Sequence, residues 1–277
     1  MRSFRQRAAR PIRPVVVSSR QPTQPMDAPR ERTSWLQGGG AVCRTPPRAV
    51  ARPSRLVLLG PPGVGKGTQA QLLSAHTGAC ALSTGDIFRN AKSGTLERPS
   101  PAMRTAVASM NRGELVPDDI VLSIVHERLR CLTCRGGFLL DGFPRTVAQA
   151  EALDHLLARE HLHLHAALFY ELPARAVIAR LTGRRTCPVC KTVFHLTNHP
   201  PKVAGLCDYC HLPLVQRADD EPETVGVRMA EYVECTAPLV EYYREHGRLR
   251  TIDASGTPNE VFQRTLAILN PATRAVD

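Results

Sequence analysis

Short apolar runs alternate with longer stretches of helical spacing over most of the chain. We expect strands at residues 56–59, 137–140, 166–170 and 249–252, and helices at 145–159, 173–181 and 222–246. Strands that alternate with helices of this length are typical of a parallel sheet, because each return crossover requires a helix. The pattern predicts an α/β fold with helices on both faces of a parallel sheet.

The first 55 residues lack this pattern. They hold twelve Arg, no Lys and only Asp27 and Glu31 as acids, which places +10 of the chain's net charge of +11 there. Prolines recur, and the one apolar cluster, at 15–17, has little surface to bury against the entropy of ordering. We therefore predict that residues 1–55 are a disordered Arg/Pro-rich extension. It is a solvated tail, an organelle transit peptide, or the product of a start site upstream of one near Met26.

The remaining 222 residues carry 24 basic and 23 acidic side chains. Because this part is nearly neutral, we expect no nucleic-acid partner for it. No apolar run reaches the roughly 18 residues that a membrane-spanning helix needs. We expect a cytoplasmic monomer without membrane association, or an organellar protein if the extension is a transit peptide.

A glycine-rich motif, GPPGVGKGT, joins the first predicted strand to a helical pattern beginning at Gln69. Its glycines let backbone amides turn toward an anion, and the following helix adds its positive end. Lys66 offers a charge to the β and γ phosphate oxygens, and Thr68 offers a hydroxyl to phosphate or Mg²⁺. The motif predicts an ATP site made by Gly63, Val64, Gly65, Lys66, Gly67 and Thr68.

The order GKGT, with a glycine between Lys66 and Thr68, resembles the nucleoside monophosphate kinases and in particular the adenylate kinases. Further similar motifs follow in the family's order: STGDIFR at 83–89, GELVPDDIV at 113–121, GFLLDGFPRT at 137–146, RLTGRR at 180–185, QRADDEPETVGVRM at 216–229 and APLVEYY at 237–243.

The resemblance implies a P-loop NTPase-type kinase core at 56–277 that converts ATP and AMP into two ADP. It also implies two insertions in that core. One is the acceptor insertion at 83–114, which binds AMP, and the other is the lid at 182–221.

Phosphoryl transfer between nucleotides brings two polyanions together, so the protein must position them and neutralise charge. The resemblance implies catalytic roles for Lys66, Arg145, Arg184, Arg217 and Arg228, with Asp141 organising Mg²⁺ through water. It adds Arg180, Arg184 and Gly256 to the ATP site. It assigns AMP to Thr84, Arg89, Glu114, Leu115, Val116, Gly142, Phe143, Pro144, Arg145, Gln149, Arg217 and Arg228.

Thr84 and Gln149 are the residues that the resemblance places at the acceptor base. Relatives that act on UMP or CMP usually carry Ala and Asn there, so this pair favours AMP. A kinase that prefers UMP, CMP or GMP remains the alternative.

Four of the nine cysteines form two CxxC pairs inside the lid: Cys187, Cys190, Cys207 and Cys210. Two such turns can surround one tetrahedral ion and leave no open position, which is typical of structural Zn²⁺. The lid resembles the zinc-bearing lids of bacterial members, although Lys191 and His211 stand where such turns often have Gly. Substitution of a ligand by His195, His199 or His211, and a lid of free thiols, are the alternatives.

Two further points bear on function. A zinc-ribbon nucleic-acid-binding protein with a regulatory P-loop would also explain the basic tail and the paired CxxC motifs. Against it, the cysteines lie between arginines that the family uses to bind phosphate.

The chain also departs from the family's ETVRxR, because Gly226 replaces an arginine. We expect this glycine either to remove a cation from the site or to weaken its helix by about 1 kcal/mol.

Overall fold

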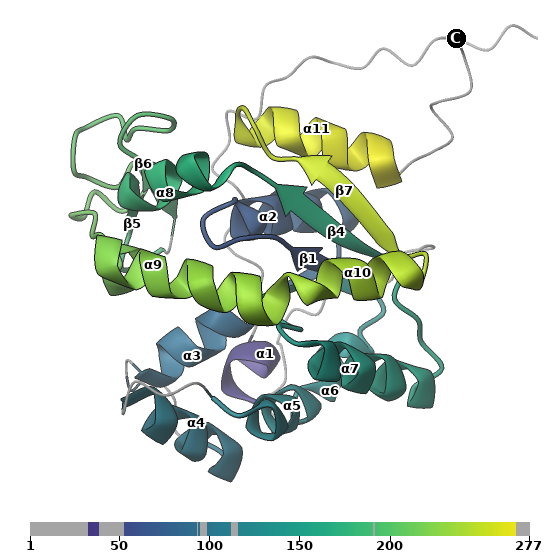
Figure 1. The fold of residues 1–277 in the computed structure, drawn as a ribbon. Coiled ribbons are helices and arrows are strands. Elements are labelled where there is room, and N and C mark those ends of the chain that lie inside the picture. Colours follow the sequence, from purple (N-terminus) through teal and green to yellow (C-terminus); the bar gives the residue numbers. More distant parts are fainter. Residues whose placement is uncertain are drawn as a thin grey trace, which may run out of the picture.

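The computed structural model describes residues 33–38, 53–92, 94, 99–111, 116–190 and 192–269. Its central sheet has five parallel strands in the order β2-β3-β1-β4-β7 (Figure 1). Their bounds are Ser54–Leu59 for β1, Cys80–Ser83 for β2, Gly137–Asp141 for β3, Ala166–Glu171 for β4 and Leu249–Asp253 for β7. The four predicted strands are confirmed. Strand β2, in which Cys80, Ala81 and Leu82 are apolar, was not among the predicted strands.

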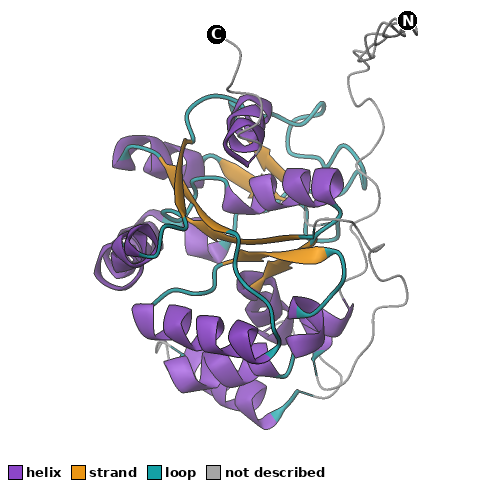
Figure 2. Ribbon diagram, turned by 90° about the vertical axis from the view of Figure 1, so that its right-hand side faces the viewer, coloured by secondary structure: helices purple, strands orange, loops and turns teal. Residues whose placement is uncertain are grey.

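Helices cover both faces of this sheet (Figure 2). On one face, Leu56 and Leu58 of β1 pack with α2 (Lys66–Thr77) and α11 (Pro258–Leu269). On the other, Val57 and Leu59 pack with α5 (Asp118–His126), α7 (Val147–Arg159) and α10 (Pro238–Glu245). Successive strand residues point to opposite faces, so a strand covered on both sides must be apolar throughout. The predicted α/β fold class is confirmed.

The predicted helix at 222–246 is continuous but irregular. It comprises α9 (Pro222–Glu231), a π-helical turn at Tyr232–Thr236, and α10. Pro238 has no N–H to donate, and within the turn the Ala237 N–H donates to the Tyr232 carbonyl at 2.8 Å, five residues back. The remaining predicted helices correspond to α7 and to α8 (Ala174–Thr182).

Both insertions leave the carboxyl edge of the sheet. The described part of the acceptor insertion contains α3 (Thr84–Lys92) and α4 (Pro101–Asn111). The lid contains an antiparallel pair, β5 (Arg184–Thr186) and β6 (Val193–His195), and a short 3-10 helix at Ala218–Asp220.

One segment of the N-terminal extension is folded. Helix α1 (Thr33–Gln37) carries Trp35, whose side chain is fully buried in the same cluster as Val57 and Leu59. The prediction of disorder for residues 1–55 is therefore wrong for this helix and for the start of β1. A single large aromatic side chain buries enough surface to fix a short segment, which an average over the whole extension conceals. Residues 1–32 and 39–52 lie outside the described residues.

No helix in the described ranges combines the length and apolar character needed to cross a membrane.

Candidate functional site

The loop after β1 is shaped by glycines at the carboxyl edge of the sheet, where open parallel sheets bind their ligands. Gly60 and Gly65 have φ of 134° and 108°, values that side chains with a Cβ rarely adopt. A Cβ at Gly60 would also collide with the Tyr170 carbonyl oxygen on β4. Only glycine therefore lets this loop lie against the neighbouring strand.

Lys66 begins α2 and folds back over this loop. Its Nζ donates to the carbonyl oxygens of Gly60 and Pro61 at 2.7 and 2.9 Å. Burial lowers the pKa of Lys66 to about 8, and the Asp141 carboxylate opposes that shift only in part. Burial likewise raises the pKa of Asp141, against the opposing charge of Lys66. Lys66 is thus a desolvated cation beside a desolvated carboxylate, an arrangement that favours binding of a polyanion with its metal.

Six predicted cations lie close enough to interact; we call Lys66, Arg89, Arg145, Arg184, Arg217 and Arg228 the cation cluster. The positive charges of Arg145, Arg228 and Arg184 each lower the pKa of Lys66. Burial, followed by Arg184 and Arg89, lowers the pKa of Arg217 to about 10. These side chains come from the sheet edge, the acceptor insertion, the lid and α9. The fold therefore brings like charges together, which is favourable only where an anion neutralises them.

The lid side of the cluster is ordered by Asp220, which is fully buried. The Arg184 Nε donates to Asp220 Oδ2 at 2.7 Å, and its Nη2 pairs with the other carboxylate oxygen. Arg228 Nη1 lies 3.4 Å from the same carboxylate and donates to the Asp219 carbonyl at 2.6 Å. Arg217 Nε donates to the Thr186 hydroxyl at 3.0 Å. The two aspartates at the end of the lid thus bind Arg184 of the lid and Arg228 of α9.

The acceptor side of the cluster meets the end of β3. The Thr84 hydroxyl donates to the Gly142 carbonyl at 2.9 Å, and Arg145 Nε donates to the same oxygen at 3.1 Å. Arg145 is otherwise exposed, as is much of Arg89, whose guanidinium pairs with Asp86 at 2.7 Å. The two arginines assigned to the acceptor phosphate are therefore accessible.

Gln149 is 3% exposed and is bound within the protein. Its Oε1 accepts from the Arg145 N–H at 2.8 Å, and its Nε2 donates to Asp118 Oδ1 at 2.6 Å. Asp118 also accepts from the Thr146 hydroxyl, the cap of α7, at 2.7 Å. The sequence interpretation gave Asp118 no role, although it lies in the motif GELVPDDIV. This carboxylate fixes the amide of Gln149, which the resemblance places at the acceptor base.

The other acceptor residues differ in how much the structure says about them. Phe143 is buried and is joined to Pro144 by a cis peptide bond, and Val116 is half-buried. Glu114 and Leu115 lie outside the described residues.

On the ATP side, Arg180 ties the glycine-rich loop to the loop after β7. Its guanidinium donates to the carbonyls of Val64 at 3.0 Å, Ala254 at 2.8 Å and Gly256 at 3.2 Å. Burial lowers the pKa of Arg180, with the carboxylate of Asp253 opposing the shift. The predicted residues Val64, Arg180 and Gly256 are thereby brought together. Gly67 lies beside Asp141, since a Cβ there would be 3.5 Å from the carboxylate.

Gly226 lies exposed on α9, and a Cβ there would have no atom within 4 Å. Its position in open space supports the expected loss of helix stability rather than a gap in the cation cluster.

The four lid cysteines converge. Their sulfur atoms all lie within 4.8 Å of one another, and Cys190 Sγ is 3.5 Å from Cys207 Sγ. In a tetrahedral site with Zn–S bonds of about 2.3 Å, the sulfurs are about 3.8 Å apart. The thiols therefore fit a zinc ion. Among the residues that the structure describes, this is the one such group of potential ligands, and none of the three lid histidines belongs to it.

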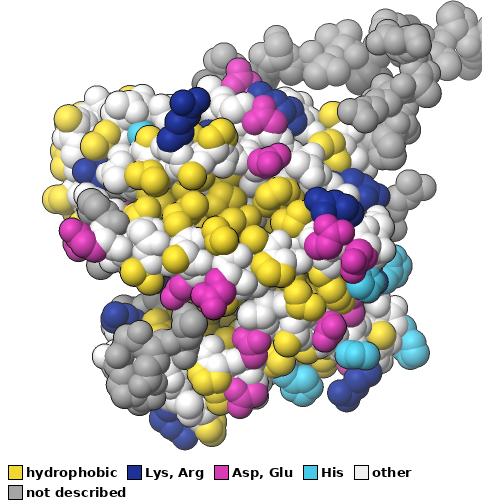
Figure 3. Space-filling view, viewed as in Figure 1, with side chains coloured by type: hydrophobic (Ala, Val, Ile, Leu, Met, Phe, Trp, Pro, Cys, Tyr) yellow, Lys and Arg dark blue, Asp and Glu magenta, His cyan; other side chains and the backbone are white. Residues whose placement is uncertain are grey.

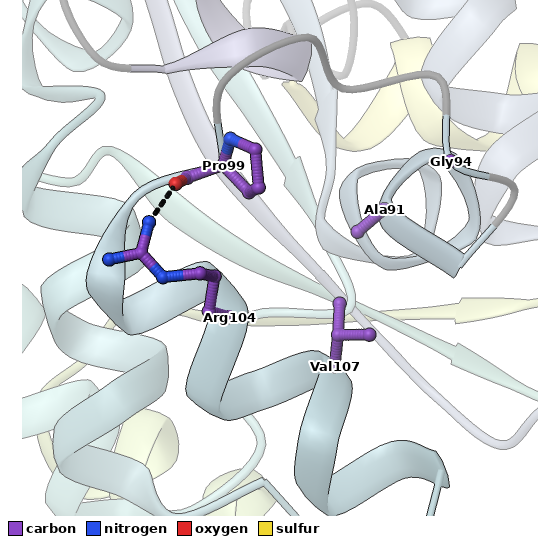
Figure 4. Close-up of a pocket in the computed structure, with 5 residues that line it drawn as sticks. All are labelled: Ala91, Gly94, Pro99, Arg104 and Val107. Carbon is purple, nitrogen blue, oxygen red and sulfur yellow. Dashed lines mark hydrogen bonds between the residues drawn. The ribbon is translucent and has the colours of Figure 1, made fainter.

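A small pocket lies elsewhere, between α3 and α4 (Figure 4). It has a volume of about 210 Å³ and is lined by Ala91, Gly94, Pro99, Arg104 and Val107. Arg104 donates to the Pro99 carbonyl at 2.7 Å. None of the predicted site residues lines it, so it is separate from the cation cluster.

Comparison with known proteins agrees with this geometry. A family model described as adenylate kinase matches residues 58–248. The chain is 51% identical to the adenylate kinase of Moorella thermoacetica over 201 residues, which cover 73% of this chain and 91% of that protein. It is 47% identical to the adenylate kinase of Acidothermus cellulolyticus over 220 residues, 79% of this chain and 100% of that protein.

Proposed function

This chain belongs to the adenylate kinase family, and we propose that it catalyses the reversible conversion of ATP and AMP into two ADP. The observation that carries the proposal is the convergence of Lys66 with arginines from four parts of the fold, at the edge where the glycine-rich loop lies. A cluster of cations, of which Lys66, Arg217 and Arg228 are desolvated, is suited to two phosphate chains placed end to end.

The transfer itself requires no group covalently bonded to the protein. An oxygen of the AMP phosphate forms the new bond to the γ phosphorus, and the bond from that phosphorus to the β–γ bridging oxygen breaks. Lys66 stabilises the charge that develops on the β and γ oxygens. Arg145 holds the acceptor phosphate, and Arg184, Arg217 and Arg228 neutralise the transferring group. These roles are carried over from the family motif to the matching positions.

Two metal ions belong to the proposal. We assign the hydrated Mg²⁺ of ATP to Asp141, because a carboxylate beside the start of α2 offers the oxygen donor that this ion prefers. When bound, Mg²⁺ neutralises phosphate charge. We assign a structural Zn²⁺ to Cys187, Cys190, Cys207 and Cys210, where it would hold the lid together.

Base selection rests on Thr84 and Gln149. One donor hydrogen of the Gln149 amide and one lone pair of its oxygen remain after the bonds to Asp118 and Arg145. That leaves one donor and one acceptor for the adenine edge, so we propose AMP as the preferred acceptor. Equal or higher kcat/KM with UMP, CMP or GMP would favour the alternative kinase.

We propose a cytoplasmic monomer for which nucleotides are the ligands. On the face drawn in Figure 3, Lys and Arg are interspersed with Asp and Glu, and hydrophobic side chains occupy the centre. This face offers no continuous basic track for a nucleic acid.

The test is a coupled assay of ADP formation from ATP and AMP. The unmodified chain should form ADP only when both nucleotides are present. Lys66→Ala should slow turnover by roughly 10³-fold or more, by analogy with the loss of an arginine finger. As a matched control, Lys202→Ala removes an exposed lid lysine and should leave turnover unchanged. ADP formation that does not depend on AMP would exclude the proposed reaction.

A further inference from the structure

Helix α1 lies outside the region that the family model matches, yet it is built into the acceptor side of the molecule. Figure 1 shows it between α3 and α5, and it contacts α3 on one side and α6 (Leu129–Leu132) on the other. The Trp35 side chain is fully buried, and its Nε1–H donates to the Ser83 carbonyl at 3.0 Å. Ser83 ends β2 and immediately precedes Thr84.

A buried cation holds the other end of α1. Arg128 is 1% exposed, and its Nε donates to the Trp35 carbonyl at 2.6 Å. Its Nη1 donates to the Ile124 carbonyl at 2.7 Å and pairs with Glu127 at 3.3 Å. Gly38 packs directly on the guanidinium, because a Cβ there would lie 2.8 Å from it. Without α1, this guanidinium would lose a buried partner, which is costly for a charged group.

The two contacts link separate parts of the molecule. Through Ser83, Trp35 contacts the strand end from which the acceptor insertion departs; through Arg128, it contacts the junction of α5 and α6 in the core. The Thr84 hydroxyl, next in the chain, bonds the Gly142 carbonyl beside Arg145. A displacement of Ser83 would therefore be transmitted to both the base side and the phosphate side of the acceptor site.

We propose that α1 is a support for the acceptor site and that Trp35 is a positioning residue for AMP. The proposal rests on the proposed function. It predicts that a segment preceding the residues matched by the family model sets the affinity for the acceptor and leaves the affinity for ATP unchanged, since the contacts of α1 lie on the acceptor side.

The unmodified chain supplies the first test, because Trp35 is its only tryptophan. Its fluorescence therefore reports on α1 alone. AMP added by itself should change the emission or its quenching by acrylamide, with the midpoint that calorimetry gives for AMP binding. ATP added at concentrations that saturate only its own site should leave both unchanged. AMP binding in the calorimeter with no change in emission or quenching, or equal responses to both nucleotides, would overturn the proposal.

Substitutions supply the second test. Trp35→Ala should raise KM for AMP about tenfold, a loss typical of modest misplacement of substrate-binding groups, while KM for ATP stays unchanged. Trp35→Phe keeps an aromatic ring but loses the N–H donor, so it should raise KM for AMP by less. Gln37→Ala, an exposed position on the same helix, is the matched control and should change neither constant.

Unchanged KM for AMP in folded Trp35→Ala would overturn the role of α1, as would equal rises in both constants. If Trp35→Ala does not fold, Trp35→Phe and the fluorescence of the unmodified chain decide the matter. Failure of the proposed function looks different, because an unmodified chain that forms no ADP from ATP and AMP refutes that function whatever Trp35 does.

Discussion

The lid and the acceptor insertion are held together by different means. The buried hydrophobic cluster of the lid consists of Cys187, Phe194 and Cys207, with Cys190, Cys210 and Leu214 packed against it. In the acceptor insertion, Ile87 and Met103 belong instead to the large cluster that also contains sheet residues. The lid therefore has only a small hydrophobic cluster of its own, whereas the acceptor insertion shares the core of the sheet.

Exposed apolar side chains also show that the lid has only a small hydrophobic core. Val189, Val203 and Tyr209 are 62%, 59% and 53% exposed, so these large apolar side chains remain mostly in water. Burial of apolar surface is the main source of folding energy, and this segment has little of it. The Zn²⁺ that we propose for the four cysteines would supply stability that a core supplies elsewhere.

Removal of the metal should produce the largest difference between the two regions. Structural zinc contributes on the order of 10 kcal/mol in small peptides, so chelation or Cys207→Ser should unfold the lid while the sheet stays folded. Hydrogen exchange should become fast at 182–221 and remain slow in the sheet, with loss of ADP formation. Cys235→Ser, a free cysteine outside the lid, is the control and should bind zinc as before. Full protection of the lid without zinc would contradict this comparison.

A cavity made in the acceptor insertion should destabilise the whole core rather than the insertion alone. Met103→Ala removes a side chain that is 1% exposed, and it should lower the free energy of unfolding by about 2–5 kcal/mol. Because Met103 shares the main core, the whole sheet should melt earlier in one transition. Thr105→Ala, an exposed neighbour on α4, should stay within about 0.5 kcal/mol. Local melting of α4 alone would show that this insertion, too, is independent.

The pH dependence of kcat/KM should report on Lys66 in the glycine-rich loop rather than on either insertion. Burial lowers the pKa of Lys66 to about 8, so the amine loses its charge as the pH rises past that value. We expect kcat/KM to fall by about tenfold for each further pH unit. The lowered pKa also means that the stability contributed by this group rises between pH 8 and the ordinary lysine pKa of 10.5, so unfolding would not explain the fall.

Lys66→Arg is the control for that profile, because its guanidinium keeps its charge. Its kcat/KM, although lower, should not decline in this range. A flat profile for the unmodified chain up to about pH 10, near the ordinary value for lysine, would remove Lys66 as the titrating group.

Gly226→Ala should raise the stability of the sheet region by about 1 kcal/mol, because alanine is the better helix former and open space surrounds the position. Thermal unfolding of the variant and of the unmodified chain measures this change in stability. Zinc affinity and turnover should not change, and a large gain in turnover would show instead that a side chain at this position contributes to the site.

The smallest expected effect is on the second cysteine turn of the lid. His211 has φ of 55°, a left-handed conformation that costs a side chain with a Cβ more than it costs glycine. His211→Gly should stabilise the metal-bound lid by roughly 0.5 kcal/mol after the added entropy of the unfolded glycine. Competition with a zinc chelator measures this. A lower zinc affinity in the variant would mean that the histidine ring itself stabilises the site.

Much of the fold and site could be predicted from local sequence. The glycine-rich loop with Lys66 could be recognised because all its residues are adjacent in the sequence. The strands β1, β3 and β4 were predictable because burial on both faces leaves apolar runs. The CxxC spacing was informative because two ligands of one ion come from a single turn.

The remainder depends on pairs of residues far apart in the chain. Three hydrogen bonds show this. Trp35 donates to Ser83, 48 residues away in the chain; Gln149 donates to Asp118, 31 residues away; and Arg184 donates to Asp220, 36 residues away. Nothing near Trp35 distinguishes it from the rest of a basic, proline-rich extension.

By itself, the sequence therefore determined which residues we propose for binding phosphate, nucleotide and metal. Only the tertiary structure decided which carboxylates hold the arginines and the glutamine, and that α1 belongs to the acceptor side. The reason is physical. A motif is stabilised by its neighbours in the chain, whereas a buried polar contact forms only after the sheet and helices have brought distant residues together and removed water from between them.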